Sequence, residues 1–250
     1  MEKTLTQPRV RIGRTEMDFP HQGRVLKAVH PFYGPANSLN LLRQIRGSPE
    51  NQTGLVEPTS AELASFVHEY LNGDGPQARE VSRIMKERFF TGFTGIRKYF
   101  RGFTGILYLP KERVAHFIDY PNFNGDSFVD RDDLLKRLGE SRAQVSFEHL
   151  KQGHVNWKDV GNHPYFVAWA GGKEGAEKLA ELASKHPKKE AFMFVPNVLD
   201  LEESTAGVAA LYSYWASDSL YVDSSYRGDD VDSYAFGVLK ETSEAGSQKI

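Results

Sequence analysis

Periodic apolar positions predict helices and strands along most of the chain. The clearest helix begins at Thr59, which forms a capping-box pattern with Glu62 and precedes apolar residues at helical spacing. Short apolar stretches bounded by turn residues predict strands instead. The pattern predicts helices over 37–46, 59–71, 77–89, 134–138, 173–186 and 203–215, and strands over 24–30, 106–109, 114–119, 165–170, 191–195, 220–223 and 234–239.

One stretch carries the strongest information about the fold. Over about 164–196, an apolar strand, a Gly171-Gly172 turn, an amphipathic helix and a second apolar strand follow one another. Strand, helix and strand in this order favour a right-handed parallel crossover. We therefore predict an α/β fold, with α+β as the alternative, in which a mixed β-sheet is flanked by helices within a single domain.

The predicted domain organisation is simple, because no stretch has the composition of a linker between domains. We expect an irregular N-terminal segment over 1–20, one globular domain over 21–240 and a frayed tail over 241–250. A helical N-terminal lobe that ends near residue 101 is the alternative division.

Composition narrows the class of protein. Hydrophobic residues make up 40% of the chain and aromatic residues 12%, which is enough bulk for a core and argues against disorder. The absence of cysteine excludes disulfides, thiolate catalysis and cysteine-bound metals. The N-terminus lacks the apolar region of a signal peptide, and no apolar stretch approaches the ~20 residues of a membrane helix. We therefore expect a soluble, cytoplasmic protein without a membrane partner.

Charge is distributed unevenly along the chain. Residues 1–101 hold 15 lysines and arginines against 10 acidic residues, whereas residues 102–250 hold 16 against 23. The segment 79–103 interleaves basic and aromatic residues. Basic side chains neutralise phosphates and aromatic faces stack on unpaired bases, so this mixture favours single-stranded nucleic acid. The residues predicted to bind nucleic acid are Arg88, Arg97, Lys98, Tyr99, Arg101 and Phe103.

This basic aromatic segment has a purely structural alternative. Its basic residues also fit the solvated side of an amphipathic helix and loop, with the phenylalanines in the core. The acidic balance of the whole chain argues against a dedicated nucleic-acid binder, because such domains are usually markedly basic.

A glycine-rich turn is the second candidate site. Gly172 and Gly175 match two positions of the dinucleotide fingerprint G-x-G-x-x-G, while Ala170 replaces the first glycine. Backbone N–H groups at the start of a helix can hold a phosphate. The predicted phosphate-binding residues are Gly171, Gly172, Lys173 and Gly175. The alternative is an ordinary glycine-rich connection with Lys173 in solvent.

Three weaker patterns have simple structural explanations. Residues 122–130 alternate oxygen ligands as calcium loops do, but a turn followed by a helix N-cap accounts for the same residues. Four aspartates crowd one region and are typical either of a magnesium site or of a solvated loop, namely Asp223, Asp229, Asp230 and Asp232. The histidines best placed for a cleft, none with metal-ligand spacing, are His30, His116 and His163. We predict no metal site.

Two functions of different classes follow from these sites. The first is a non-enzymatic binding protein that contacts nucleic acid, another polyanion or a protein partner through the basic aromatic segment. The alternative is an enzyme or binder of a phosphorylated small molecule or nucleotide that uses the turn at 171–175. The sequence specifies neither a cofactor nor an oligomeric state.

Overall fold

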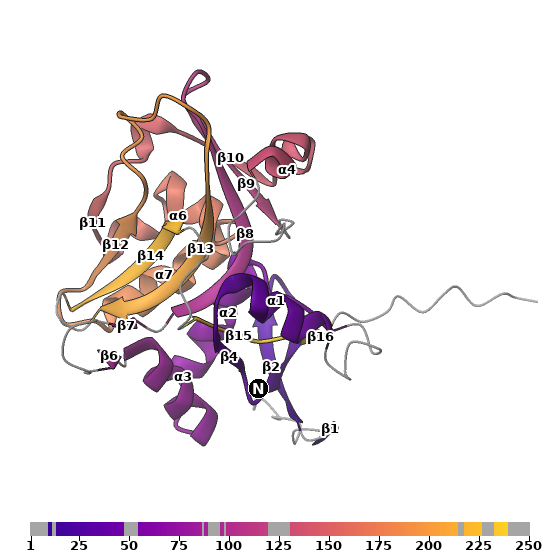
Figure 1. Ribbon diagram of the computed structural model, residues 1–250. Helices are drawn as coiled ribbons and strands as arrows, with labels where there is room; N and C mark the ends of the chain where they lie inside the picture. Colours follow the sequence, from indigo (N-terminus) through magenta and orange to yellow (C-terminus); the bar gives the residue numbers. More distant parts are fainter. Residues whose placement is uncertain are drawn as a thin grey trace, which may run out of the picture.

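The computed structural model describes residues 10–11, 14–47, 55–86, 88–89, 96–97, 99–119, 131–214, 218–226 and 233–239. Within these ranges, nine strands form one large sheet (Figure 1). β12 runs parallel to β14 and β15 parallel to β8, so the sheet is mixed. Its main path contains, in spatial order, β10 (Ala143–Ser146), β9 (Val114–Asp119), β8 (Tyr99–Leu109), β13 (Thr205–Tyr214), β14 (Ser219–Tyr226), β12 (Glu190–Phe194) and β11 (Gly153–Asn156), while β15 (Ser233–Ala235) and β4 (Tyr33–Ala36) pair beside β8.

A second sheet is built mostly from the N-terminal part of the chain. Its five described strands are, in spatial order, β1 (Val10–Arg11), β2 (Arg14–His21), β3 (Arg24–His30), β16 (Val238–Leu239) and β5 (Leu55–Val56). β16 therefore lies between β3 and β5, although it is the last described strand in sequence. Because β15 belongs to the large sheet and β16 to the small one, the segment 233–239 joins the two sheets.

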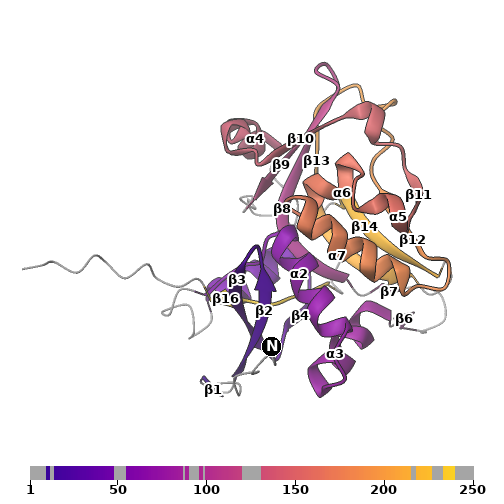
Figure 2. The same cartoon turned by 180° about the vertical axis from the view of Figure 1, so that it is seen from behind.

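Helices cover one face of the large sheet. Figure 2 shows α6 and α7 lying over β12 and β14, and Leu179 and Leu182 of α7 share the main hydrophobic cluster with Ala191 and Val222 of those strands. The described helices are α1 (Ser38–Arg46), α2 (Ser60–Leu71), α3 (Pro76–Lys86), α4 (Arg131–Lys136), α5 (Trp157–Val160), α6 (Pro164–Trp169) and α7 (Lys173–Ser184). In the described ranges, no helix has the length and apolar character needed to cross a membrane.

Helix α2 begins as its sequence predicts. The Thr59 hydroxyl accepts a hydrogen bond from the Glu62 backbone at 3.2 Å, and the Glu62 carboxylate accepts one from the Thr59 backbone at 2.8 Å. The first turn of α2 packs directly on β8, where a Cβ added to Gly102 would lie 2.6 Å from the Cα of Ser60. A glycine in β8 therefore permits the helix to approach the strand.

The core supports the predicted fold class. The main hydrophobic cluster contains Phe19 of the small sheet together with Phe100 and Phe117 of the large sheet and Phe66 of α2. A second cluster lies under α1 and α4 on the other side of β8. The prediction of a mixed sheet flanked by helices is confirmed, and the architecture is the α+β alternative.

Helix α6 corrects the strand predicted over 165–170. Pro164 occupies the first turn of α6, and the His163 ring accepts a hydrogen bond from the Tyr165 backbone at 3.3 Å. Proline at this position and a side-chain cap both favour a helix start. The unit over 164–196 is therefore helix, helix and strand, so the predicted parallel crossover was wrong there.

Strand β13 corrects the helix predicted over 203–215. The residues from Val208 to Tyr212 are all buried, with exposed fractions of 0–2%, because the side chains on both faces of β13 pack in hydrophobic clusters. A strand covered on both faces has a continuous apolar run rather than an alternating one. A continuous apolar run is equally typical of a buried helix, so the sequence pattern predicts a helix here. The first 20 residues also differ from the prediction, since β2 begins at Arg14 and pairs with β3.

Candidate polyanion-binding surface

The first part of the basic aromatic segment contains a short antiparallel pair. β6 (Arg88–Phe89) pairs with β7 (Ile96–Arg97), and the register sets Arg88 opposite Arg97. The register thus brings two basic positions of the segment together, while the side chains of both arginines lie outside the described residues. Lys98 and residues 90–95 lie outside the described residues.

Strand β8 begins two residues after β7 and carries the segment into the large sheet. Its register sets Arg101 opposite Ala210 of β13. Phe103 is fully buried in the core, as the structural alternative for the phenylalanines predicts. Stacking of a base on Phe103 would require the core to open, so Phe103 supports the strand rather than the surface.

Aromatic residues form a line across four neighbouring strands of the large sheet. His154 of β11 pairs with Phe192 of β12, Phe192 pairs with Tyr221 of β14, and Tyr221 pairs with Tyr212 of β13. The ring centroids are 4.8 Å apart for the first pair, 4.7 Å for the second and 4.9 Å for the third. We call these four residues the aromatic row. Sequence analysis missed it, because cross-strand register joins residues from 154 to 221.

The aromatic row meets β8 at its first residue. Leu211 of β13 pairs with Phe100 of β8, so one further step of the same register brings position 99 alongside Tyr212. Position 99 is a tyrosine that the sequence predicts to bind nucleic acid. The row therefore runs from β13, the neighbour of β8, to the edge strand β11.

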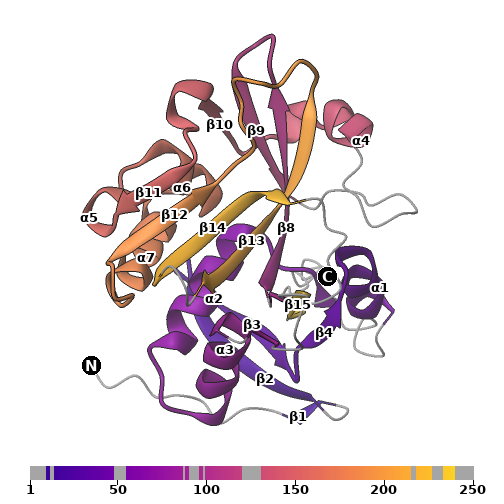
Figure 3. The ribbon, with the colours of Figure 1, turned by 60° about the vertical axis from the view of Figure 1, so that its left-hand side comes forward.

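Exposure increases along the row. Tyr212 is 2% exposed and Tyr221 is 9% exposed, whereas Phe192 is half-buried and His154 is exposed. Phe194, two residues along β12, is also half-buried and its ring lies 6.0 Å from that of Phe192. Figures 1 and 3 show this face of β12 and β14 without a covering helix among the described elements. Accessible aromatic surface is thus concentrated on β12 and β11.

The glycine-rich turn connects two helices rather than a strand and a helix. Gly171 and Gly172 have φ of +73° and +132°, values that favour glycine, and the Gly171 carbonyl accepts a hydrogen bond from Gln22 at 3.1 Å. A Cβ on Gly175 would lie 2.1 Å from the Ala170 carbonyl oxygen, so Gly175 serves close packing of the two helices.

Charge at this turn is mixed. Lys173 is exposed and lines a shallow groove of about 360 Å³ between α5 and α7. Glu174 occupies the first turn of α7, where its carboxylate interacts favourably with the helix dipole. Its hydrogen bond with Lys178 lowers the pKa of that carboxyl group. A phosphate at this helix start would meet an ionised carboxylate.

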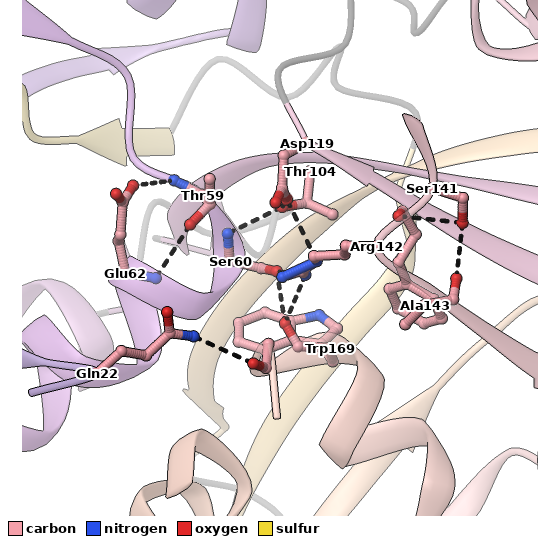
Figure 4. A network of polar contacts seen from close by, with 12 residues as sticks. Gln22, Thr59, Ser60, Glu62, Thr104, Asp119, Ser141, Arg142, Ala143 and Trp169 are labelled. Atoms are coloured by element: carbon pink, nitrogen blue, oxygen red, sulfur yellow. Dashed lines mark hydrogen bonds and ion pairs between the residues drawn. The ribbon is translucent and has the colours of Figure 1, made fainter. Parts of the chain in front are cut away.

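A partly buried polar junction, shown in Figure 4, lies where α2, β9 and α6 meet. Arg142 donates to the Ser60 hydroxyl at 2.7 Å and to the Trp169 carbonyl at 3.0 Å, and its Nε lies 3.4 Å from Asp119. Thr104 donates to the same Asp119 oxygen at 2.6 Å. These contacts link α2 to β8, β9 and α6, so the junction holds α2 on the large sheet.

A second polar cluster joins Ser65, His21 and Lys178. The Ser65 hydroxyl lies 3.0 Å from His21 Nδ1 and 3.0 Å from Lys178 Nζ. This grouping resembles the environment of a nucleophilic serine, which needs a base within hydrogen-bond reach. Ser65 is only 2% exposed, however, and burial lowers the pKa of His21 to about 4. The geometry therefore suits a structural clamp between β2, α2 and α7.

The remaining predicted site residues lie apart from one another. His30 Nε2 is 2.6 Å from Glu80, His116 is buried in β9, and His163 caps α6. Asp223 is buried in β14, whereas Asp229, Asp230, Asp232 and residues 122–130 lie outside the described residues. Over the described part of the chain, no group of three or more histidine and carboxylate side chains is arranged to hold a metal ion.

Comparison with known proteins provides one structural likeness. No protein-family model matches the chain, and no curated protein matches it. A solved structure from work on how the C-type lectin fold accommodates massive sequence variation in Nanoarchaeota is similar over 81% of this chain and 93% of that chain. The TM-score is 0.47 and the sequence identity is 10%.

Proposed function

We propose that the chain is a non-enzymatic binding protein that contacts a polyanion through the basic aromatic segment. The observation that carries this proposal is the pairing of Arg88 with Arg97 in the β6–β7 pair. Two arginine residues at opposed positions cost stability in isolation, and a phosphate or sulfate group removes that cost. Arg101 follows on β8, so basic residues continue into the large sheet.

The described polar clusters favour binding over catalysis. Ser65 and His21 are buried, Lys178 is half-buried, and Arg142 is occupied by Ser60, Trp169 and Asp119. A catalytic group must reach its substrate within hydrogen-bond distance. Arg88, Arg97 and Arg101 instead lie on the successive strands β6, β7 and β8, and we propose that an extended anion follows this segment.

The test is a titration of fluorescently labelled oligonucleotides and heparin with the protein at several salt concentrations. Neutralising phosphates releases counterions, so the affinity for a single strand falls with salt, with a slope of about −0.7 per phosphate contact. Removing two contacts in Arg88→Gln/Arg97→Gln should reduce the slope by about 1.4 and weaken binding roughly 25-fold at 0.1 M salt.

A matched control carries two arginine substitutions elsewhere. Arg43→Gln/Arg113→Gln removes the same charge from exposed positions on α1 and in the β8–β9 turn, and it should leave both the slope and the affinity near those of the wild type. The proposal is refuted if the wild type binds no polyanion at low salt. It is equally refuted if the two double variants lose affinity to the same extent.

A further inference from the structure

We infer that His163 is an acid-sensitive latch, whose protonation loosens the first turn of α6. The ring caps the start of this helix, where its Nδ1 accepts a hydrogen bond from the Tyr165 backbone N–H at 3.3 Å. A ring nitrogen accepts a hydrogen bond only while it carries no proton, because both nitrogens of a charged imidazole are donors. The cap therefore forms with neutral His163 and is lost when the ring takes up a proton.

The position of His163 disfavours its charged form in the folded protein. The N–H groups at the start of a helix carry partial positive charge, so a cation there is repelled. Burial lowers the pKa of His163 below its usual 6.5, and the positive charge of His149 lowers it further. The contribution of the cap to stability is thus complete above about pH 6.5 and decreases as the pH falls below that value.

Two neighbouring elements bring charged groups to this ring. His149 belongs to a 3₁₀ turn over Phe147–His149, and its ring centroid lies 6.4 Å from that of His163, so two charged rings would repel each other. Asp159 of α5 acts in the opposite direction and favours the charged form. Asp159 is exposed, as is Glu148 at 3.4 Å from His149, so solvent screens both carboxylates.

The contacts of α6 confine the consequence to its first turn. Tyr165 is fully buried, and its hydroxyl donates to the Val222 carbonyl of β14 at 2.9 Å. At the other end of α6, the Trp169 carbonyl accepts a hydrogen bond from Arg142 at 3.0 Å. Loss of the cap loosens the end that holds Tyr165, while the Trp169 end keeps its own hydrogen bonds. We therefore expect a local opening over 163–166 rather than global unfolding.

The experiment measures amide hydrogen exchange at the start of α6, in the full chain, at pH 7 and at pH 5. Each rate is expressed as a protection factor, which removes the pH dependence of intrinsic exchange. Between pH 7 and pH 5 the Tyr165 amide of the wild type should lose about fivefold in protection. That factor is the change in equilibrium that loss of a side-chain cap typically causes.

Two variants separate capping from protonation. His163→Asn keeps a side chain that caps helices well but takes up no proton, so Tyr165 should stay near the wild-type pH 7 protection at both pH values. His163→Ala has no cap, so its protection should be about fivefold lower already at pH 7 and should not fall further at pH 5. The wild type should therefore match the asparagine variant at pH 7 and the alanine variant at pH 5.

The control is His154→Asn, which removes a histidine from an exposed position on the edge strand β11 and should respond to pH as the wild type does. Equal loss of protection in the wild type and in His163→Asn would overturn the inference, because the asparagine cannot be protonated. Wild-type protection in His163→Ala at pH 7 would also overturn it, since the cap would then contribute nothing. Neither result depends on whether the protein binds a polyanion.

Discussion

His21 makes the stability of the fold depend on pH in a way that can be calculated. Its side chain is 5% exposed and contacts Ser65 at 3.0 Å. Burial, the largest cause, and the nearby positive charges of Lys178 and Arg24 together lower its pKa from 6.5 to about 4, while Glu174 acts in the opposite direction. The charged imidazole is therefore disfavoured in the folded protein.

The direction of the effect follows from proton binding. Between pH 6.5 and pH 4 the unfolded chain binds a proton at His21 that the folded protein does not, so the free energy of unfolding falls as the pH falls. Above pH 6.5 both states are neutral at His21 and the full stability is present. A difference of about 2.5 pH units between the two pKa values corresponds to about 3 kcal/mol at pH 4.

The assay is urea unfolding followed by tryptophan fluorescence at pH values from 7 to 4. Other groups titrate in this range, so the comparison is with His21→Asn, which cannot take up the proton. From pH 7 to pH 4 the wild type should lose about 3 kcal/mol more than this variant. His149→Asn, at a position far less buried, should follow the wild type. Parallel pH profiles for the wild type and His21→Asn would show that His21 is not the responsible group.

Three further predictions concern stability, each measured as the change in urea unfolding at pH 7. Thr59→Ala should cost about 1 kcal/mol, because it removes the hydroxyl of the capping box; no change would mean that the cap is unimportant here. Gly102→Ala should cost about 1–3 kcal/mol or more, because its Cβ would meet the Ser60 backbone; a neutral result would contradict the close approach. Trp169→Phe should cost about 1–3 kcal/mol, because the Asp223 carbonyl loses the indole N–H that donates to it at 3.1 Å. A loss of stability no larger than the smaller buried apolar area of phenylalanine explains would contradict the importance of this hydrogen bond.

Local sequence predicts the elements whose determinants are local. The capping box of α2 is formed by residues three apart, and the strand over 24–30 is β3 with the same bounds. The hairpin over 106–119 is also correct, since β8 and β9 contain both predicted strands. In each case the residues that define the element lie within one short stretch.

Two errors have a common physical cause. The predicted strand at 165–170 is α6, and the predicted helix at 203–215 is β13. Both contain short apolar runs that are mostly buried, for which periodicity does not separate helix from strand. Tertiary contacts decide between them, such as the 2.9 Å hydrogen bond from the Tyr165 hydroxyl to Val222.

The candidate surface was predictable only in part. The sequence identifies the basic aromatic segment, because its charged and aromatic residues are contiguous. It does not identify His154, Phe192 or Tyr221 as neighbours, because cross-strand register depends on the order of strands in the finished sheet. The sequence also groups Phe103 with the surface. In the structure, successive side chains of β8 point to opposite faces of the sheet, and the side chain of Phe103 lies in the core.

The position of β16 has a consequence for biosynthesis. The small sheet contains residues that leave the ribosome early, yet its inner strand is Val238–Leu239. During translation β3 and β5 therefore lack β16, the strand that pairs with both of them. That strand is synthesised only when nearly the whole described chain has been made. Such distant pairing slows folding and leaves strand edges open to other chains in the meantime. We expect the nascent protein to depend on chaperones until its last described residues emerge.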